Sequence, residues 1–193
     1  MVNPGGNTVA SVSSLERIAM AKYKVTPTGV ESPFSEEEII VSKTDPKGHI
    51  VYANDVFLRV GKFKLGEVIG QPHSLIRHPD MPRSVFKLLW DTIQAKQELF
   101  AYVVNMASNG DHYWVLAHVT PSFDASGNIV GYHSNRRKPD PAQVTKIKGI
   151  YDELLAEERR SEDRKIGMEN AYNKLTGMLK DMKVSYEEFI FSF

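Results

Sequence analysis

Three strand-like segments joined by tight turns constrain the fold of this chain more than any other feature. Residues 100–106, 112–123 and 128–137 are rich in β-branched and aromatic residues, which favour strands. Asn109-Gly110 lies between the first two segments, and this dipeptide favours a hairpin. A second turn, over residues 124–127, separates the last two. The pattern predicts a three-stranded antiparallel meander.

A further hairpin is predicted upstream. The apolar segments 39–41 and 49–52 flank Asp45-Pro46-Lys47-Gly48, in which proline presets φ and glycine adds backbone freedom. A short helix is expected after Asn54 or Asp55, and a longer one over residues 84–95, where apolar residues recur at helical spacing. The fold class is therefore α+β: a five-stranded antiparallel sheet with short helices and one longer helix on one face, plus flanking N- and C-terminal helices.

The chain divides into three parts. We expect a flexible N-terminal segment over residues 1–36, with a short helix from Ser14 to Lys22, then a central domain over 37–139 and a helical extension over 140–193. Asp140-Pro141 suits the start of a helix. Two apolar stripes follow, too short to identify a coiled coil. The apolar end, residues 189–193, either packs on its own domain or offers a surface to a partner.

Composition limits the classes of function. Lys plus Arg and Asp plus Glu both number 24, so no broad electrostatic attraction to nucleic acid or anionic membrane is expected. The chain has no cysteine, which excludes disulfides and thiol catalysis and is compatible with a reducing cytosol. No apolar run reaches the roughly 20 residues that span a bilayer. With no P-loop or catalytic triad motif either, we expect a soluble cytoplasmic protein that is not an enzyme.

The central part carries a specific combination of motifs. One is Arg77-His78-Pro79-Asp80-Met81-Pro82, and the other is Asn109-Gly110-Asp111-His112-Tyr113-Trp114. Together with the segments 52–57, 69–73 and 131–132, they make residues 42–138 resemble the PAS domain of the bacterial aerotaxis receptors, which sense redox or energy state. The resemblance implies the PAS fold and a sensor that takes part in signal transduction.

The resemblance also implies a ligand and a partner. Receptors of this family hold FAD without a covalent bond and signal to a chemotaxis kinase. The family pattern transfers cofactor-binding roles to six residues here: Asn54, Arg77, His78, Asp80, Trp90 and Asn105. A flavoprotein redox sensor is thus expected, with a chemoreceptor or histidine kinase as its partner and homodimerisation through the flanking helices.

The last strand departs from the family pattern at His133 and Asn135. If these two residues face the pocket, they join the flavin site. Alternatively, His133 or His118 is the axial ligand of a haem or contacts another small molecule. A third possibility is a cofactor-free adaptor that only dimerises, its pocket filled by side chains.

Several of these residues also have purely structural explanations. Asn54 and Asp80 suit helix caps, His78 can bond to the backbone, and Trp90 suits core packing. The basic run over residues 136–138 is typical of a solvated strand end, although it could also contact phosphates or an acidic partner.

Overall fold

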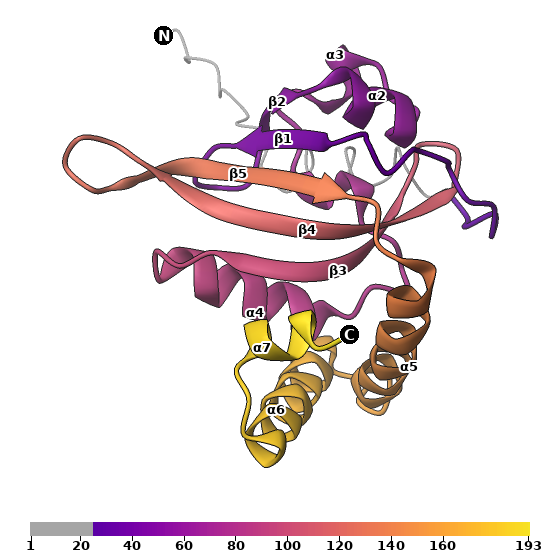
Figure 1. Ribbon diagram of the computed structural model, residues 1–193, viewed down its shortest axis with the longest axis vertical. Coiled ribbons are helices and arrows are strands. Elements are labelled where there is room, and N and C mark those ends of the chain that lie inside the picture. Colours follow the sequence, from indigo (N-terminus) through magenta and orange to yellow (C-terminus); the bar gives the residue numbers. More distant parts are fainter. Residues whose placement is uncertain (1–24) are drawn as a thin grey trace, which may run out of the picture.

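The computed structural model describes residues 25–193, so the helix expected over Ser14–Lys22 lies outside the described residues. One five-stranded antiparallel sheet organises the chain, in the spatial order β2-β1-β5-β4-β3 (Figure 1). The strands are β1 (Ile40–Thr44), β2 (Ile50–Ala53), β3 (Leu99–Met106), β4 (His112–Phe123) and β5 (Ile129–Arg137). The predicted hairpin, the predicted meander and the α+β class are confirmed.

The turn between β3 and β4 depends on Gly110. Its φ is +95°, in the left-handed region that glycine adopts without a steric penalty. A Cβ atom there would also collide with the carbonyl oxygen of Thr26. The turn is tied down further by Asp111, which accepts a hydrogen bond from Thr28 Oγ1 at 2.6 Å and pairs with Lys62. These contacts hold the N-terminal segment against the meander.

Short helices and one longer helix cover the inner face of the sheet. They are α2 (Asp55–Gly61), α3 (Leu65–Val68), the 3-10 helix η1 (His73–Ile76) and α4 (Arg83–Gln94). The inner face presents the odd-numbered residues of β3, such as Ala101 and Val103, which pair with Ala117 and Val115 of β4. Alternate residues of a strand point to opposite faces, so the even-numbered residues lie on the outer face.

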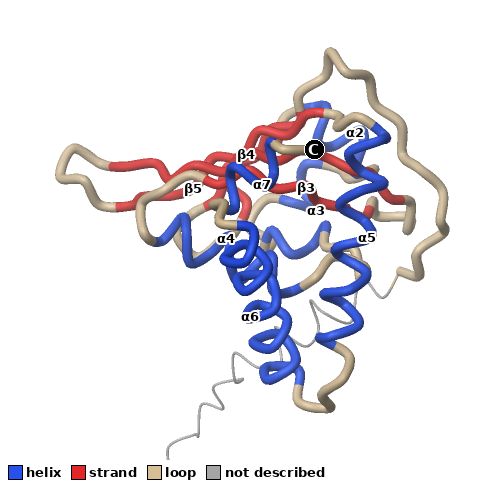
Figure 2. Tube along the Cα trace, turned by 60° about the horizontal axis from the view of Figure 1, so that its bottom comes forward, coloured by secondary structure: helices blue, strands red, loops and turns tan. Residues whose placement is uncertain are grey.

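The C-terminal third is helical: α5 (Pro141–Glu158), α6 (Arg164–Met182) and α7 (Tyr186–Phe191). Helices α5 and α6 run side by side (Figure 2), α6 contacts α4, and α7 contacts the edge strand β3. Tyr151 of α5 donates a hydrogen bond to the Tyr102 carbonyl at 2.6 Å. These helices therefore wrap around the β3 edge and continue the core of the sheet.

Side-chain caps begin α5 and α7, and the one at Asp140 is predicted from the sequence. Asp140 accepts a hydrogen bond from the Ala142 amide with Pro141 as the first helical residue, and Ser185 forms a reciprocal capping box with Glu188. The apolar end packs on its own chain: Phe189 and Ile190 are buried, and the Phe193 ring lies 5.9 Å from that of Tyr102.

The cap expected for α4 differs from the observed one. Asp80 is exposed and does not cap α4, whose N-cap position is Pro82. The Ser84 amide instead donates to the Glu158 carboxylate of α5 at 2.8 Å. A distant helix thus satisfies a buried donor that sequence reasoning assigned to a local residue.

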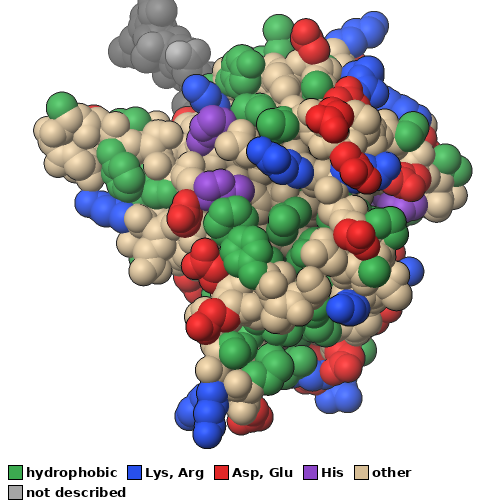
Figure 3. Space-filling model, viewed as in Figure 1, with side chains coloured by type: hydrophobic (Ala, Val, Ile, Leu, Met, Phe, Trp, Pro, Cys, Tyr) green, Lys and Arg blue, Asp and Glu red, His purple; other side chains and the backbone are tan. Residues whose placement is uncertain are grey.

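Charged side chains of both signs are intermixed on the face seen in Figure 3, without a large patch of one sign. Within residues 25–193, none of the helices combines the length and the apolar character needed to cross a bilayer.

Candidate ligand-binding site

Two adjoining cavities lie beside α4. One lies between α4 and the inner face of the sheet, and the other lies between α4, the β1–β2 turn and the η1 segment. Their volumes are about 80 and 210 Å³. They share five lining residues: Gly48, His73, Phe86, Trp90 and Asn105. The walls combine aromatic and aliphatic side chains with a few convergent polar groups, as is usual for small-molecule sites. We treat the two together as the inner cavity.

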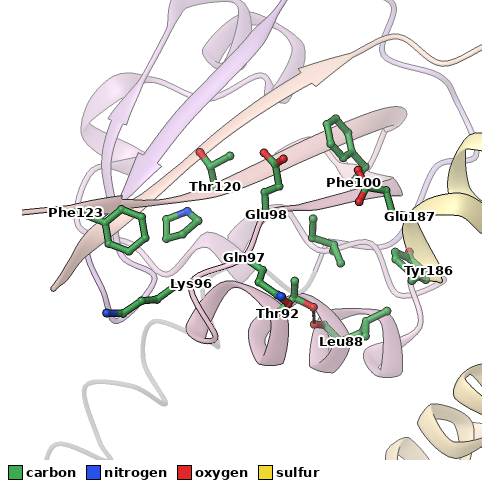
Figure 4. Close-up of a pocket in the computed structure, with 12 residues that line it drawn as sticks. Leu88, Thr92, Lys96, Gln97, Glu98, Phe100, Thr120, Phe123, Tyr186 and Glu187 are labelled. Carbon is green, nitrogen blue, oxygen red and sulfur yellow. Dashed lines mark hydrogen bonds between the residues drawn. The ribbon is translucent and has the colours of Figure 1, made fainter. Parts of the chain in front are cut away.

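A larger hollow lies elsewhere and is not the candidate site. It measures about 640 Å³, is open to solvent, and lies where the end of α4, strands β3 and β4, and α7 meet (Figure 4). Its labelled residues include Lys96, Glu98 and Glu187, and none of the eight residues predicted for the cofactor site lines it. The buried polar groups described below converge on the smaller, inner cavity.

Asn105 is the central polar residue of the inner cavity. It is 3% exposed, and its Nδ2 atom has no hydrogen-bond partner in the described structure. The residue lies on the inner face of β3, opposite Tyr113 of β4. A buried amide left without a partner destabilises a protein by about 1–3 kcal/mol, which makes this side chain a candidate for contact with a ligand.

Arg77 and Trp90 lie beside Asn105. The backbone of Arg77 bridges to that of Asn105, and the guanidinium lies 4.0 Å from the centre of the Phe86 ring. Its Nε atom has no partner in the described structure, and burial lowers the pKa of this arginine. Trp90 lines both cavities, with its ring edge against Tyr132.

His73, Ser42 and Arg136 form a second polar cluster in the inner cavity, and the sequence did not predict it. Arg136 is 3% exposed, so the interpretation of residues 136–138 as a solvated strand end is wrong for this residue. Its Nη2 atom lies 2.9 Å from Ser42 Oγ and 2.6 Å from His73 Nε2. Burial, reinforced by Arg136 and Arg77, lowers the pKa of His73 to about 3, so the imidazole is neutral and accepts hydrogen bonds.

Three predicted residues lie away from the inner cavity. The side chain of Asn54 caps α2 by accepting from the Phe57 amide at 2.9 Å, accepts from the Val41 amide, and donates to the Ile39 carbonyl. His78 and Asp80 line a different hollow, beside α5. His78 Nδ1 accepts from the Asp80 amide at 3.1 Å, and the Asp80 carboxylate lies 3.7 Å from the guanidinium of Arg159.

His133 and Asn135 lie on the opposite face of the sheet. Tyr132, Ser134 and Arg136 of β5 line the inner cavity, so the residues between them point outward. His118, the other histidine considered for haem, pairs with Asn135 in the sheet register and contacts Glu98 on the outer side at 2.7 Å. The geometry therefore places none of these three in the inner cavity.

The structure thus brings together Arg77, Trp90 and Asn105 of the predicted set and adds His73 and Arg136. The sequence carried one signal for Arg136, its alternation with Tyr132 and Ser134 along the last strand. Within residues 25–193, no group of three or more His, Asp or Glu side chains is arranged to hold a metal ion.

Comparison with known proteins places this geometry in context. Residues 50–136 match the family described as the PAS fold. The chain is 36% identical to the aerotaxis receptor of Escherichia coli over 129 residues, which cover 67% of this chain and 25% of the receptor. It is 26% identical to the nitrogen fixation regulatory protein of Klebsiella pneumoniae over 122 residues, which cover 63% of this chain and 25% of that protein. The chain thus spans about a quarter of the length of these relatives.

A solved structure supports the fold independently. It is a light-oxygen-voltage domain studied with a flavin analogue; it has a TM-score of 0.52 and 18% sequence identity, and the match covers 77% of this chain and 96% of that one. At this identity the likeness concerns the fold alone.

Proposed function

Residues 50–136 of this chain form a PAS domain, and on that premise we propose that the chain is a cytoplasmic sensor that binds FAD in the inner cavity and relays redox state to a signalling partner. The observation that carries this proposal is a set of buried donors without partners in the described structure. They are Asn105 Nδ2, Arg77 Nε, Ser134 Oγ and Arg136 Nη1, and all four belong to residues that line the inner cavity.

These donors suit the edge of a flavin ring. The pyrimidine side of the isoalloxazine presents carbonyl oxygens and ring nitrogens that accept hydrogen bonds, while its flat faces suit apolar walls such as Phe86 and Trp90. None of the residues that line the two cavities is acidic, so nothing there repels an acceptor-rich ligand. When bound, the flavin supplies a reversible two-electron couple. The residues would bind and orient the ring.

The cavity must widen to admit a ring of this size. Its two parts, about 80 and 210 Å³, compare with roughly 300–1,000 Å³ for typical ligand sites. The Trp90 ring packs on Gly48, where a Cβ atom would lie only 3.1 Å from it. We therefore assign Trp90 the role of the wall that shifts when ligand enters.

A route by which a signal could pass from the cavity to the C-terminal helices starts at the segment that contains Arg77. Arg77 faces the cavity, whereas His78 and Asp80 lie beside α5. Further contacts to the helical extension follow: Arg83 bonds to the Arg164 carbonyl, and the Ser84 amide to Glu158. A change at Arg77 would reach α5 and α6 through these contacts. A chemoreceptor or histidine kinase that binds the helices is the partner we propose, with homodimerisation through the same helices.

The absorbance spectrum of the purified chain after incubation with FAD tests this function. We expect flavin bands and near-stoichiometric binding. Asn105→Ala should lower the affinity for FAD at least tenfold, because it removes a central donor. It should leave the flavin-free protein equally or more stable, since a buried group without a partner is removed. Asn109→Ala, in the β3–β4 turn, is the control and should keep full binding.

A colourless protein that takes up no FAD contradicts the flavin proposal. One observation, the small volume of the cavity in this structure, favours the second candidate in that case: a cofactor-free adaptor whose pocket is filled by Trp90 and its neighbours. A protein with a Soret band would instead indicate haem, held by a histidine other than His118 or His133.

A further inference from the structure

Arg136 is a buried cation without an anionic partner. Its side chain comes from the inner face of β5, where the residue pairs with Ala117 and Ile40. The two groups that hold it, Ser42 and His73, engage only the Nη2 atom. The Nη1 atom has no hydrogen-bond partner within residues 25–193. Buried charges in proteins are usually paired, so this geometry calls for an explanation.

The positive charge of Arg136 is not neutralised by its neighbours. Ser42 is uncharged, and His73 is neutral because its pKa is lowered to about 3. The other titratable group that faces Arg136 is Tyr113, and burial raises its pKa to about 12, which keeps the phenol protonated. Burial lowers the pKa of Arg136 itself to about 10, so the guanidinium stays charged at neutral pH.

The two other cations that line the cavity, Lys47 and Arg77, are in a different situation. Lys47 is exposed to solvent. The carboxylate of Glu158 acts on Arg77 and favours its charged form. No acidic residue acts in this way on Arg136 among the described residues, and none lines the inner cavity. The unbalanced buried charge of the cavity is therefore concentrated at Arg136, which lines the cavity and whose Nη1 atom has no hydrogen-bond partner among the described residues.

We propose that Arg136 holds the negative charge that a flavin gains on reduction, and so raises the affinity of this protein for the reduced over the oxidised ligand. The inference rests on the proposed function. With an external two-electron donor, uptake of two electrons and one proton would leave a bound ring with one negative charge. The guanidinium of Arg136 would provide the compensating charge, so that the second proton would stay in solvent. Ser42 and His73 are positioning residues that fix the guanidinium without neutralising it.

The wild-type protein alone can test this inference. The midpoint potential of bound FAD would be measured at several pH values in mildly acidic buffer, where free reduced flavin takes up two protons. Uptake of one proton with two electrons shifts the potential by about 30 mV per tenfold change in proton concentration, and uptake of two protons by about 59 mV. We expect the smaller slope, and the larger slope would overturn the proposal.

Three variants test whether Arg136 is the source of the preference for reduced flavin. Arg136→Met removes the charge at similar length and should lower the preference for reduced over oxidised flavin about tenfold, which is about 30 mV for this couple. Arg136→Lys keeps the charge and should recover most of this preference. Arg137→Met is the matched control, since Arg137 is exposed and on the opposite face of the sheet; it should leave the potential unchanged.

The outcomes separate this inference from the proposed function. A wild-type chain that binds no FAD contradicts the proposed function, and the inference with it. A chain that binds FAD, with the same potential in wild type and folded Arg136→Met, contradicts the role of Arg136 alone. If Arg136→Met does not fold, the slope measured on the wild type still tests the proposal, because the larger slope would overturn it.

Discussion

His73 shows how the surroundings of one buried side chain determine its charge. The imidazole lies against the guanidinium of Arg136, and burial, together with Arg136 and Arg77, disfavours its protonation. A neutral imidazole has one donor and one acceptor nitrogen, and Nε2 of His73 is the acceptor because a guanidinium can only donate. The polar group of the cavity depends on this neutrality, because a protonated His73 would repel Arg136.

The pKa of His73 predicts a specific dependence of stability on pH. The unfolded chain binds this proton below the ordinary value of 6.5, whereas the folded chain binds it only below about 3. Between these values the unfolded state holds more protons, so stability falls as pH decreases through this range. Urea unfolding at a series of pH values should therefore show a shallower loss for His73→Gln than for wild type. Identical pH profiles for the two proteins would contradict this assignment.

At the scale of elements, α4 depends on a helix far away in sequence. The Ser84 amide in the first turn of α4 donates to Glu158, which is 9% exposed at the end of α5. The N-terminal amides of a helix need acceptors, and Pro82 at the N-cap position supplies none from its side chain. Glu158 therefore joins the helix that lines the cavity to the helical extension.

Removing this acceptor should weaken the whole protein. Glu158→Ala leaves a buried amide without a partner and should cost about 1–3 kcal/mol of unfolding free energy. Glu158→Gln keeps an acceptor and should cost less. The control is Glu157→Ala, which removes an ion pair with the exposed Arg160 and should cost less than about 1 kcal/mol. Urea denaturation measures all three, and equal losses for Glu158→Ala and Glu157→Ala would argue against the cap.

At the scale of the molecule, the sheet and the C-terminal helices share one apolar core. We therefore predict that they unfold together. Ile190 in α7 is fully buried, and Ile190→Ala should cost about 2–5 kcal/mol. Ile166 in α6 is 53% exposed, and Ile166→Ala should change stability by less than about 0.5 kcal/mol.

Two probes can follow this unfolding. Tryptophan fluorescence reports on the sheet and the cavity through Trp114 and Trp90, and far-UV circular dichroism reports mainly on the helices. The two transitions should coincide in wild type and shift together in Ile190→Ala. A separate early transition of the helices would show that the extension is an independent unit.

Much of this architecture was predictable from local sequence. The Asn109-Gly110 turn and the strand-like segments around it predicted the meander, and Asp140-Pro141 predicted the start of α5. Local pattern could not decide which face of β5 meets the cavity, because alternation gives two faces and only the packed helices identify the inner one. For this reason the sequence-based prediction of the cofactor site contains His133 and Asn135 but not Arg136.

The contacts that local sequence does not predict join residues far apart in the chain. Glu158 lies 74 residues from Ser84, and Arg136 lies 63 residues from His73. No local motif encodes such a pair, since each partner is an ordinary polar residue in its own segment. Asn105 lies between these cases: the family resemblance implied a cofactor-binding role for it, but only the structure shows that its Nδ2 atom has no partner among the described residues.

The opposite directions of Arg77 and His78 have a consequence for how this protein can change over evolution. Arg77 lines the inner cavity, and the next residue lines the hollow beside α5. One added or deleted residue in this segment would exchange the two sides. A change of length between Ile76 and Asp80 should therefore be tolerated less easily than a substitution. We expect relatives to vary in loop length in the segment that precedes η1 rather than between Ile76 and Asp80.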